Sequence, residues 1–254
     1  MKNRDKIKLT PEEIERYTPH ILLNEIGGLG QKKIKNAKVA VVGAGGLGAP
    51  ILSYLAAAGI GTLGIVDNDI VSLSNLQRQI IHTTDKIGIQ KTDSAEQAIK
   101  NINPHVKVHK HMLQLNPSNT DILSSYDIII DGSDNFTTRY LLADFSEKIK
   151  KPLVSGAVSR FNGLITVLKP YENQNPRYRD LFPIPPPTHT MLSCSESGII
   201  SALPGVIGSL QAMETIKIIT GIGTNLVGRI LLYDGLQVRF ETITYKKNKR
   251  YHYS

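Results

Sequence analysis

The residues best suited to chemistry are the glycines and charged side chains that flank one uncharged stretch, residues 39–66. Gly43-Ala-Gly45-Gly46-Leu-Gly48 matches the pattern G-x-G-x-x-G directly after the apolar run Val39–Val42. In such a loop the glycines permit a tight turn, backbone approach to a phosphate and close helix–strand packing. Asp67 follows 24 positions after Gly43, where a carboxylate can accept hydrogen bonds from a ribose hydroxyl. These residues predict a nucleotide site whose phosphates face the loop.

Three elements must position these residues, and they form a strand–helix–strand unit. Val39–Val42 and Leu63–Val66 are apolar runs typical of buried parallel strands, and Ala49–Ala58 between them suits a helix. An uncharged stretch as long as residues 39–66 would also suit a membrane-spanning helix. Seven glycines and Pro50 in that interval, and the change of period within it, favour the βαβ unit.

A polar, irregular segment follows the second strand, at the edge where open α/β sheets bind ligands. Arg78 offers a planar fork of donors suited to phosphate oxygens, although a lone arginine is often only a solvated surface residue. Asn75 and Gln77 could add neutral hydrogen bonds. Lys91 begins the helix expected over residues 92–102, where a cation opposes the helix dipole unless an anion is bound. An exposed lysine is the alternative.

Another buried strand, Tyr126–Asp131, leads into the loop Gly132-Ser133-Asp134-Asn135 at the same edge. The carboxylate of Asp134 suits Mg²⁺ held against a triphosphate, because Mg²⁺ prefers oxygen ligands. A turn or cap role is the alternative. Asn135 or Thr137 is expected to cap a helix that runs to about residue 149.

His105 lies just before the strand expected over residues 106–111, and His109 and His111 lie within it. The three histidines share one face. Such a face could bind a metal, but a half-exposed polar strand is the stronger expectation.

The second half of the chain departs from the parallel pattern. Pro152–Ser159 and Leu164–Leu168 flank an Asn162-Gly163 pair, a hairpin signal that extends the sheet with antiparallel strands. A helix over Leu203–Thr220 and a last hairpin across Asp234-Gly235 follow.

Residues 171–197 are rich in proline and show no periodicity. A loop of this length in a compact domain is usually functional or disordered. It holds Cys194, the single cysteine, which is either an inert thiol or a group capable of covalent chemistry.

The N-terminal segment reads as a helical arm. Thr10-Pro11-Glu12-Glu13 is a capping box with proline at the first helical position, so a helix is expected from there to about Tyr17, before Pro19. Ile21–Leu23 is expected to pack on the core, and residues 31–36 to form a short helix after a Gly-Gly turn. The arm either packs on its own chain or crosses to a partner subunit.

Composition limits the class of protein. The chain has 254 residues, 41% of them hydrophobic, and a net charge of +8, which favours acidic partners or phosphorylated ligands. No nucleic-acid module is visible and aromatic residues are few. One cysteine excludes an internal disulfide framework and a multi-cysteine zinc site. With no secretory signal apparent, we expect a cytoplasmic protein that binds neither nucleic acid nor a membrane.

Five segments together carry a family resemblance: GAGGLG, VDNDIVSLSNLQRQ, GIQK, DGSDN and GVIGSLQAMETIK. From about Arg16 to Phe240 the chain resembles the MoeB/ThiF/HesA family, adenylyltransferases that activate small ubiquitin-like sulfur-carrier proteins. The resemblance implies a single α/β domain over residues 1–254, a Rossmann-like doubly wound sheet whose parallel core is extended by antiparallel hairpins. Its parts would be a helical arm (1–36), a nucleotide-binding half (37–150) and an antiparallel half (151–254) with a crossover loop (171–197).

The same resemblance implies the reaction and its residues. ATP and Mg²⁺ bind, the C-terminal Gly-Gly carboxylate of a carrier attacks the α-phosphate, and pyrophosphate leaves, in a molybdopterin or thiamine route and in a homodimer. Arg78 and Lys91 match the family's phosphate-binding cations, and Asp134 matches its Mg²⁺-associated aspartate. Cys194 matches a cysteine that bonds to the carrier in the thiamine branch. The implied nucleotide contacts are Gly43, Gly45, Gly46, Gly48, Asp67, Asp69, Ser74, Asn75, Leu76, Gln77, Arg78, Lys91, Asp134 and Asn135.

Two features depart from the family pattern. The positions that match its zinc-binding C-x-x-C pairs read Arg177-Tyr178-Arg179-Asp180 and a Lys/Tyr-rich C-terminus. No zinc is therefore expected, and prolines and the tail must hold the loop instead. Pro19 stands where members donate an arginine across the dimer to the neighbour's ATP. A catalytically weakened nucleotide- and carrier-binding scaffold is therefore the alternative function. An NAD-dependent dehydrogenase is a third, although no separate substrate domain supports it.

Overall fold

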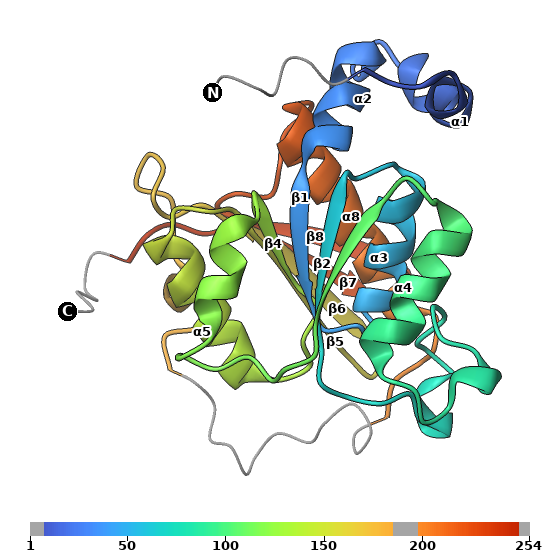
Figure 1. Cartoon of the computed structure of the whole chain (residues 1–254). Coiled ribbons are helices and arrows are strands. Elements are labelled where there is room, and N and C mark those ends of the chain that lie inside the picture. The colour runs from blue at the N-terminus through green and yellow to red at the C-terminus, as the bar shows by residue number, and fades with distance from the viewer. Residues whose placement is uncertain (1–7, 185–197, 249–254) are drawn as a thin grey trace.

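One eight-stranded sheet organises the chain, and a computed structural model describes it over residues 8–184 and 198–248 (Figure 1). The strands are β1 (Lys38–Val42), β2 (Thr62–Val66), β3 (Lys107–His111), β4 (Ile128–Asp131), β5 (Leu153–Ser159), β6 (Asn162–Leu168), β7 (Arg229–Asp234) and β8 (Arg239–Thr244). Their order is β3-β2-β1-β4-β5-β6-β7-β8. Strands β1 to β5 pair in parallel, and β6, β7 and β8 add antiparallel partners. The predicted fold class is confirmed.

Helices cover both faces of the sheet, as Figure 1 shows. The helices are α1 (Pro11–Ile21), α2 (Gly27–Asn36), α3 (Gly48–Ala57), α4 (Lys91–Ile102), α5 (Phe136–Lys148), α6 (Tyr178–Leu181) and α8 (Leu203–Thr220), with short 3-10 turns at Leu73–Asn75, Thr84–Lys86 and Thr120–Ser125. Successive strand residues point to opposite faces. In β1, Val39 and Val41 join the core under α3, α4 and α8, whereas Ala40 and Val42 join the core under α5 and α6.

The uncharged stretch divides into β1, the glycine loop, α3 and β2, which confirms the predicted βαβ unit. Close packing explains its glycines: a Cβ atom on Gly64 would lie 2.3 Å from the ring of the buried Tyr126. Within the described residues, no helix has the length and hydropathy needed to cross a bilayer.

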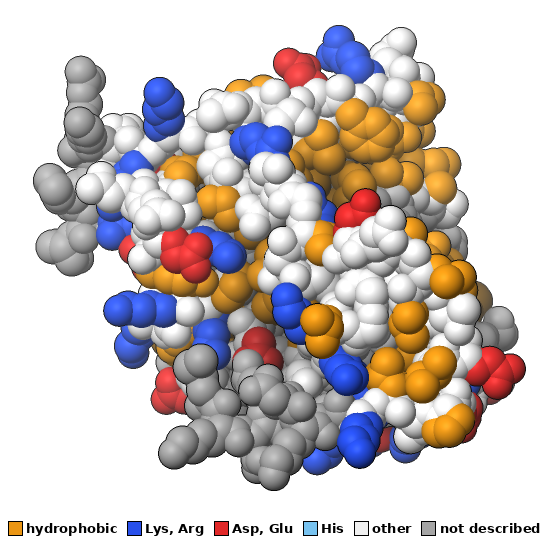
Figure 2. Space-filling view, turned by 90° about the horizontal axis from the view of Figure 1, so that it is seen from above, with side chains coloured by type: hydrophobic (Ala, Val, Ile, Leu, Met, Phe, Trp, Pro, Cys, Tyr) orange, Lys and Arg blue, Asp and Glu red, His pale blue; other side chains and the backbone are white. Residues whose placement is uncertain are grey.

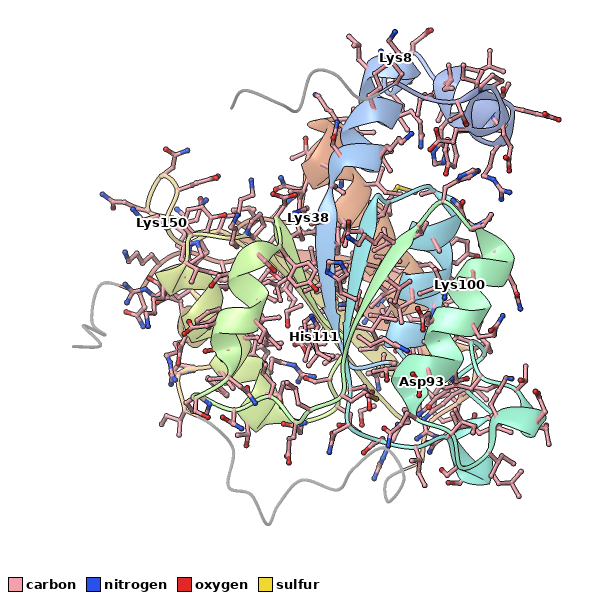
Figure 3. The ribbon with its side chains drawn as sticks, in the orientation of Figure 1. Lys8, Lys38, Asp93, Lys100, His111 and Lys150 are labelled. Atoms are coloured by element: carbon pink, nitrogen blue, oxygen red, sulfur yellow. The ribbon has the colours of Figure 1, made fainter. Side chains whose placement is uncertain are left out.

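The carboxyl ends of the parallel strands meet at one edge of the sheet. Figure 3 shows this polarity: Lys38, which begins β1, lies at the upper edge, and His111 and Asp93, at the end of β3 and in the first turn of α4, lie below it. The glycine loop follows β1, and the loop that carries Asp134 follows its neighbour β4. The fold therefore brings the two loops together, as the sequence predicted.

Helix α1 begins as predicted but passes through Pro19. The side chain of Thr10 accepts a hydrogen bond from the Glu13 N–H at 3.2 Å, and Glu13 Oε2 accepts from the Thr10 N–H at 2.7 Å. The prediction that Pro19 ends the helix is wrong, because α1 continues to Ile21. A proline this close to the end removes only one helical hydrogen bond, and His20 Nδ1 lies 3.1 Å from Gln31 Oε1 of α2.

The predicted packing of Ile21–Leu23 on the core is also wrong, since Leu22 is 75% and Leu23 49% exposed. The arm is instead held by Tyr17, which is 3% exposed and accepts a hydrogen bond from Asn103 Nδ2 at 2.8 Å. Gly27 has a positive φ of 56° and opens α2 directly, so this helix begins four residues earlier than the predicted 31–36 segment.

The antiparallel extension forms as predicted, but its turn is displaced. Ser159 pairs with Asn162, so the turn residues are Arg160 and Phe161. Arg160 takes the positive φ, 53°, that the turn requires. Gly163 lies inside β6, where a Cβ would approach Ile207 to 2.4 Å. This glycine serves packing against α8.

Candidate functional site

A cavity of about 760 Å³ lies where β1, β2 and β4 end. Its wall contains many of the predicted contacts: Gly43, Gly45, Gly46, Asp67, Asp69, Arg78, Lys91, Asp134 and Asn135. Gly48, Ser74, Asn75, Leu76 and Gln77 are not part of this wall. Cys194 lies outside the described residues. The structure therefore gathers the charged candidates but not the neutral segment between them.

The glycine loop has the geometry that its sequence predicts. Gly43 has a φ of 98°, which favours glycine, and a Cβ on Gly48 would lie 2.0 Å from the Gly43 carbonyl oxygen. Gly48 is the first residue of α3, so this contact is the close strand–helix approach expected of the third glycine. A Cβ on Gly45 would meet only Gln79 Nε2, at 3.5 Å. Above its middle glycine the loop thus faces the carboxamide of Gln79 and otherwise open space.

Asp67 fastens this loop as well as lining the cavity. Its Oδ2 accepts a hydrogen bond from the Ala44 N–H at 2.7 Å, and its Oδ1 accepts from the Asp69 N–H at 2.8 Å. Both oxygens keep further acceptor capacity. The role of Asp67 as a ribose ligand stays a prediction. Its hydrogen bond to the loop is a second role, in positioning the loop, that the sequence did not reveal.

His82 is a second fastening that the sequence analysis missed. It is 5% exposed; its Nε2 lies 2.9 Å from the Ala44 carbonyl and its Nδ1 2.8 Å from Ser94 Oγ on α4. A carbonyl oxygen only accepts, so Nε2 carries the proton and Nδ1 accepts from the serine in the neutral ring. Burial lowers the pKa of His82, and the charge of Lys91 acts in the same direction. The ring therefore bridges the glycine loop and α4 in its neutral form.

Because folding lowers the pKa of His82, acidification favours the unfolded chain. The unfolded ring binds a proton near pH 6.5 and the folded ring only at lower pH, so stability is lost as the pH falls from about 6.5 through the lowered value. We expect His82→Gln, which keeps an N–H donor, to lose less stability than wild type between about pH 7.5 and 5.5. Urea denaturation at both pH values measures this. Equal losses in the two proteins would contradict the assignment.

Lys91 is a buried cation at the edge of the cavity. It begins α4, its side chain is 6% exposed, and its Nζ lies 2.8 Å from Asp69 Oδ2. Asp69 itself is 62% exposed at its side chain. Because a buried ammonium is costly without a counter-charge, the contact with Asp69 stabilises Lys91 in its place at the cavity wall.

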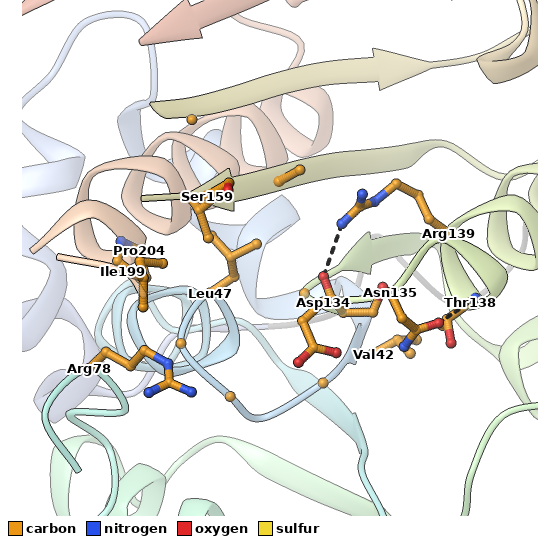
Figure 4. Close-up of a pocket in the computed structure, with 18 of the residues that line it drawn as sticks. Val42, Leu47, Arg78, Asp134, Asn135, Thr138, Arg139, Ser159, Ile199 and Pro204 are labelled. Atoms are coloured by element: carbon orange, nitrogen blue, oxygen red, sulfur yellow. Dashed lines mark hydrogen bonds between the residues drawn. The ribbon is translucent and has the colours of Figure 1, made fainter. Parts of the chain in front are cut away.

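Arg78 and Asp134 lie on either side of the glycine loop (Figure 4). Arg78 Nη1 donates to the Ser74 carbonyl at 3.2 Å, which leaves most of its donors for a ligand. Asp134 is exposed and makes no ion pair among the described residues. Asn135 caps α5 by accepting from the Thr138 N–H at 2.8 Å, as expected.

A buried ion pair beneath Asp134 was not foreseen. Asp131 and Arg139 are 0% and 4% exposed, and Arg139 Nε lies 3.0 Å from Asp131 Oδ2. Arg139 also donates to the Ser133 carbonyl at 3.1 Å, and Ser133 directly precedes Asp134 (Figure 4). The only sequence signal was that Arg139 falls one helical turn after the cap Asn135. Through the Ser133 carbonyl, Arg139 supports the loop that carries Asp134.

Helix α6, at positions that the resemblance matches to a zinc-binding pair, packs through aromatic rings. Tyr178 of α6 is 2% exposed and its ring centroid lies 5.1 Å from those of Tyr140 and Phe182. Arg179 pairs with Asp144 at 2.7 Å, and Asp180 Oδ1 accepts from the Asn248 N–H at 3.0 Å. The beginning of the C-terminal tail is therefore attached to α6.

The aromatic contacts should contribute more stability than the surface ion pair. Truncating a buried ring costs about 3–5 kcal/mol, and an exposed pair is worth about 1 kcal/mol or less. We expect Tyr178→Ala to lower the free energy of unfolding by about 3 kcal/mol and Arg179→Ala by less than about 1 kcal/mol. Chemical denaturation of both variants gives the comparison, and similar losses would show that charge holds α6.

The histidines on and just before β3 form a half-exposed polar face, as expected. His111 Nε2 lies 2.8 Å from the hydroxyl of the buried Tyr126, and His105 Nε2 lies 3.1 Å from Glu12. Burial lowers the pKa of His111 and of His109. Over the described ranges, no three His, Cys, Asp or Glu side chains are grouped closely enough to hold a metal ion.

Known proteins resemble this chain over most of its length. The ThiF family model matches residues 17–253. The chain is 47% identical over 243 residues to a probable adenylyltransferase/sulfurtransferase MoeZ of Mycobacterium tuberculosis, covering 94% of this chain and 62% of that protein. It is 43% identical over 248 residues to a sulfur carrier protein adenylyltransferase of Thermus thermophilus, covering 96% of this chain and 92% of that protein. It therefore spans about three fifths of the first relative and most of the second.

Solved structures share the fold at low identity. The crystal structure of PaaA has a TM-score of 0.80 at 22% identity, covering 98% of this chain and 79% of that one. The structure of E. coli MccB with ATP has a TM-score of 0.77 at 18% identity, covering 96% and 81%.

Proposed function

Because the chain belongs to the ThiF family, we propose that it uses ATP to adenylate the C-terminal Gly-Gly carboxylate of a small ubiquitin-like sulfur-carrier protein and releases pyrophosphate. The name of the Thermus thermophilus relative supports this substrate class. The observation that carries the proposal is the grouping of Arg78, Lys91 and Asp134 around the glycine loop in one cavity. We assign the carrier to a molybdopterin or thiamine route in the cytoplasm.

The chemistry requires positioning and charge compensation. A carboxylate oxygen bonds to the α-phosphorus, the bond from that phosphorus to the bridging oxygen breaks, and pyrophosphate departs. Both reactants are anions, so the site must hold them together and offset their charge. Arg78 and Lys91 supply positive charge, and the N–H groups at the start of α3 add favourable dipoles. The nucleophile is already ionised at neutral pH and needs no general base.

Asp134 fits a Mg²⁺ ion that accompanies ATP. Mg²⁺ is usually held by one or two carboxylates together with substrate phosphates, and Asp134 is an exposed carboxylate in the cavity wall. When bound, the ion would neutralise phosphate charge. Arg139 would keep the loop of Asp134 in place through the Ser133 carbonyl.

The test is exchange of labelled pyrophosphate into ATP. We expect exchange only in the presence of a cognate carrier that ends in Gly-Gly, and none with the same carrier lacking those two residues. Absence of exchange with any Gly-Gly carrier at high ATP concentration would contradict the proposal.

We propose that the enzyme is a homodimer. Large apolar side chains are exposed on α1, α2 and the connection between them, including Leu22 at 75% and Leu29 at 76%. Figure 2 views the molecule from the end of α1 and α2 and shows hydrophobic side chains gathered in one area. Such a patch on a protein surface usually marks an interface. Light scattering should give twice the mass of the chain.

We expect Cys194→Ala to leave adenylation unchanged. The nucleophile in that step is a carboxylate, so a thiol could serve only a later transfer of sulfur. Exchange of pyrophosphate at the wild-type rate, within about twofold, is the expected result. Loss of the carrier adenylate in this variant would show that the thiol acts in the first step.

A weakened nucleotide- and carrier-binding scaffold is the second candidate, and the arm favours it. Pro19 is exposed on α1 and carries no charge, and Arg16 donates to the Ile102 carbonyl of its own chain at 2.9 Å. Calorimetry and mass spectrometry separate the two functions. Tight binding of ATP and carrier with no AMP adduct would favour the scaffold.

A further inference from the structure

Three residues of the turn at residues 78–82 lie next to three consecutive residues of the glycine loop. Arg78 Cδ lies 3.6 Å from the position of a Cβ on Gly46, and Gln79 Nε2 lies 3.5 Å from that of a Cβ on Gly45. His82 Nε2 lies 2.9 Å from the Ala44 carbonyl oxygen. The turn therefore covers the loop, with Gln79 over its middle glycine.

Gln79 is the member of this set whose side chain has no protein partner. Arg78 donates to the Ser74 carbonyl, and both ring nitrogens of His82 are engaged. Gln79 is 4% exposed and lines the cavity, and its Oε1 is sealed from solvent without a hydrogen-bond partner. Within the described part of the chain, its Nε2 also has no hydrogen-bond acceptor, although this end is not sealed from solvent. Buried polar groups left in this way are rare and need an explanation.

The chemistry of the carboxamide points to an anion. Nε2 is the end that faces the cavity, and it can only donate hydrogen bonds. The hydrogen bonds of the described residues also leave the N–H groups of Gly45 and Gly46 without a protein acceptor. Oriented donors at a helix N-terminus form a phosphate site, and the guanidinium of Arg78 lines the same wall.

We infer that Gln79 is a further nucleotide contact, in which Nε2 donates a hydrogen bond to a phosphate oxygen held at the glycine loop. This inference rests on the proposed use of ATP. With the amide turned over, Oε1 would face the phosphate and the NH₂ group would be sealed without an acceptor, so a bound phosphate would favour the orientation with Nε2 toward the cavity. Gln79 thus completes a set of donors with Arg78 and the loop.

Titration calorimetry of the full chain with Mg²⁺–ATP and with adenosine tests the inference. Gln79→Met keeps the length of the side chain and removes the donor, and Gln79→Glu places a like charge beside the phosphate. We expect Gln79→Met to weaken ATP binding about tenfold, and Gln79→Glu to weaken it more. Both should change adenosine binding by no more than about twofold, because adenosine carries no phosphate.

The matched control is Gln97→Met, since Gln97 is exposed on α4 and bonds to Asn101. It should bind ATP as wild type does. The inference is overturned if Gln79→Met binds ATP like wild type, or if adenosine affinity falls as much as ATP affinity, which would mean that Gln79 only shapes the loop. Failure of wild type to bind ATP at all would overturn the proposed function, and this inference with it.

Discussion

Arg78→Ala should slow pyrophosphate exchange by about a hundredfold or more. The guanidinium of Arg78 lines the cavity beside the glycine loop and uses one hydrogen bond, to the Ser74 carbonyl, within the described structure. Its other donors can follow the negative charge as it develops on the phosphates. Because this interaction is stronger in the transition state than in the bound substrate, its loss should lower kcat more than it raises KM.

One further variant shows whether the planar shape of the Arg78 side chain or only its charge accelerates exchange, and a second variant is a control. Arg78→Lys keeps the charge but replaces the planar fork by a point charge, so it should recover only part of the rate. Arg179 lies on α6, far along the chain from Arg78, and pairs with Asp144. Arg179→Ala should therefore leave exchange unchanged. A rate for Arg78→Ala within about threefold of wild type would show that the transition state does not lie at this loop.

The sequence predicted the elements whose signals are local. The apolar run Val39–Val42, the glycine spacing of the loop and the cap at Asn135 each specify backbone conformation within a few residues, and each is found. Parallel pairing then brings the ends of β2, β1 and β4 together by geometry alone. For that reason Arg78, Lys91 and Asp134 could be assigned to one site from the sequence.

Side-chain direction in irregular segments could not be predicted. Gln77 and Gln79 lie two positions apart in a segment without period, and only contact with Gly45 distinguishes them: Gln79 is buried there and Gln77 is exposed. Tertiary contacts also overrode a local signal at Pro19, where α1 continues because its last turn meets α2. Long-range pairing likewise placed the hairpin turn at Arg160 and Phe161.

Buried charges were the other omission, because a sequence does not say which aspartate and arginine will meet. Asp131 ends β4, and its carboxylate accepts four hydrogen bonds. The donors are the Ser133 N–H and Oγ, Arg139 Nε and Ser155 Oγ, at 3.0, 2.6, 3.0 and 2.9 Å. Its role becomes visible only once β4, β5 and α5 have been assembled.

Arg139→Met should have the largest effect on stability, a loss of about 3–5 kcal/mol in the free energy of unfolding. Methionine fills much of the volume, but it leaves the carboxylate of Asp131, which is fully buried, without a counter-charge. The cation over the Phe136 ring, 5.0 Å from its centroid, is lost as well. Equilibrium urea denaturation of the two proteins measures the difference.

The double variant Asp131→Asn/Arg139→Met separates charge from loop support. Removing both charges should cost less than the sum of the single losses, since no uncompensated ion remains. Its pyrophosphate exchange should nevertheless stay below that of wild type, because the Ser133 carbonyl has lost the donor that positions the loop of Asp134. A double variant with restored stability and wild-type exchange would show that the pair serves folding alone. One with restored stability and slow exchange would make Arg139 a positioning residue for the proposed reaction.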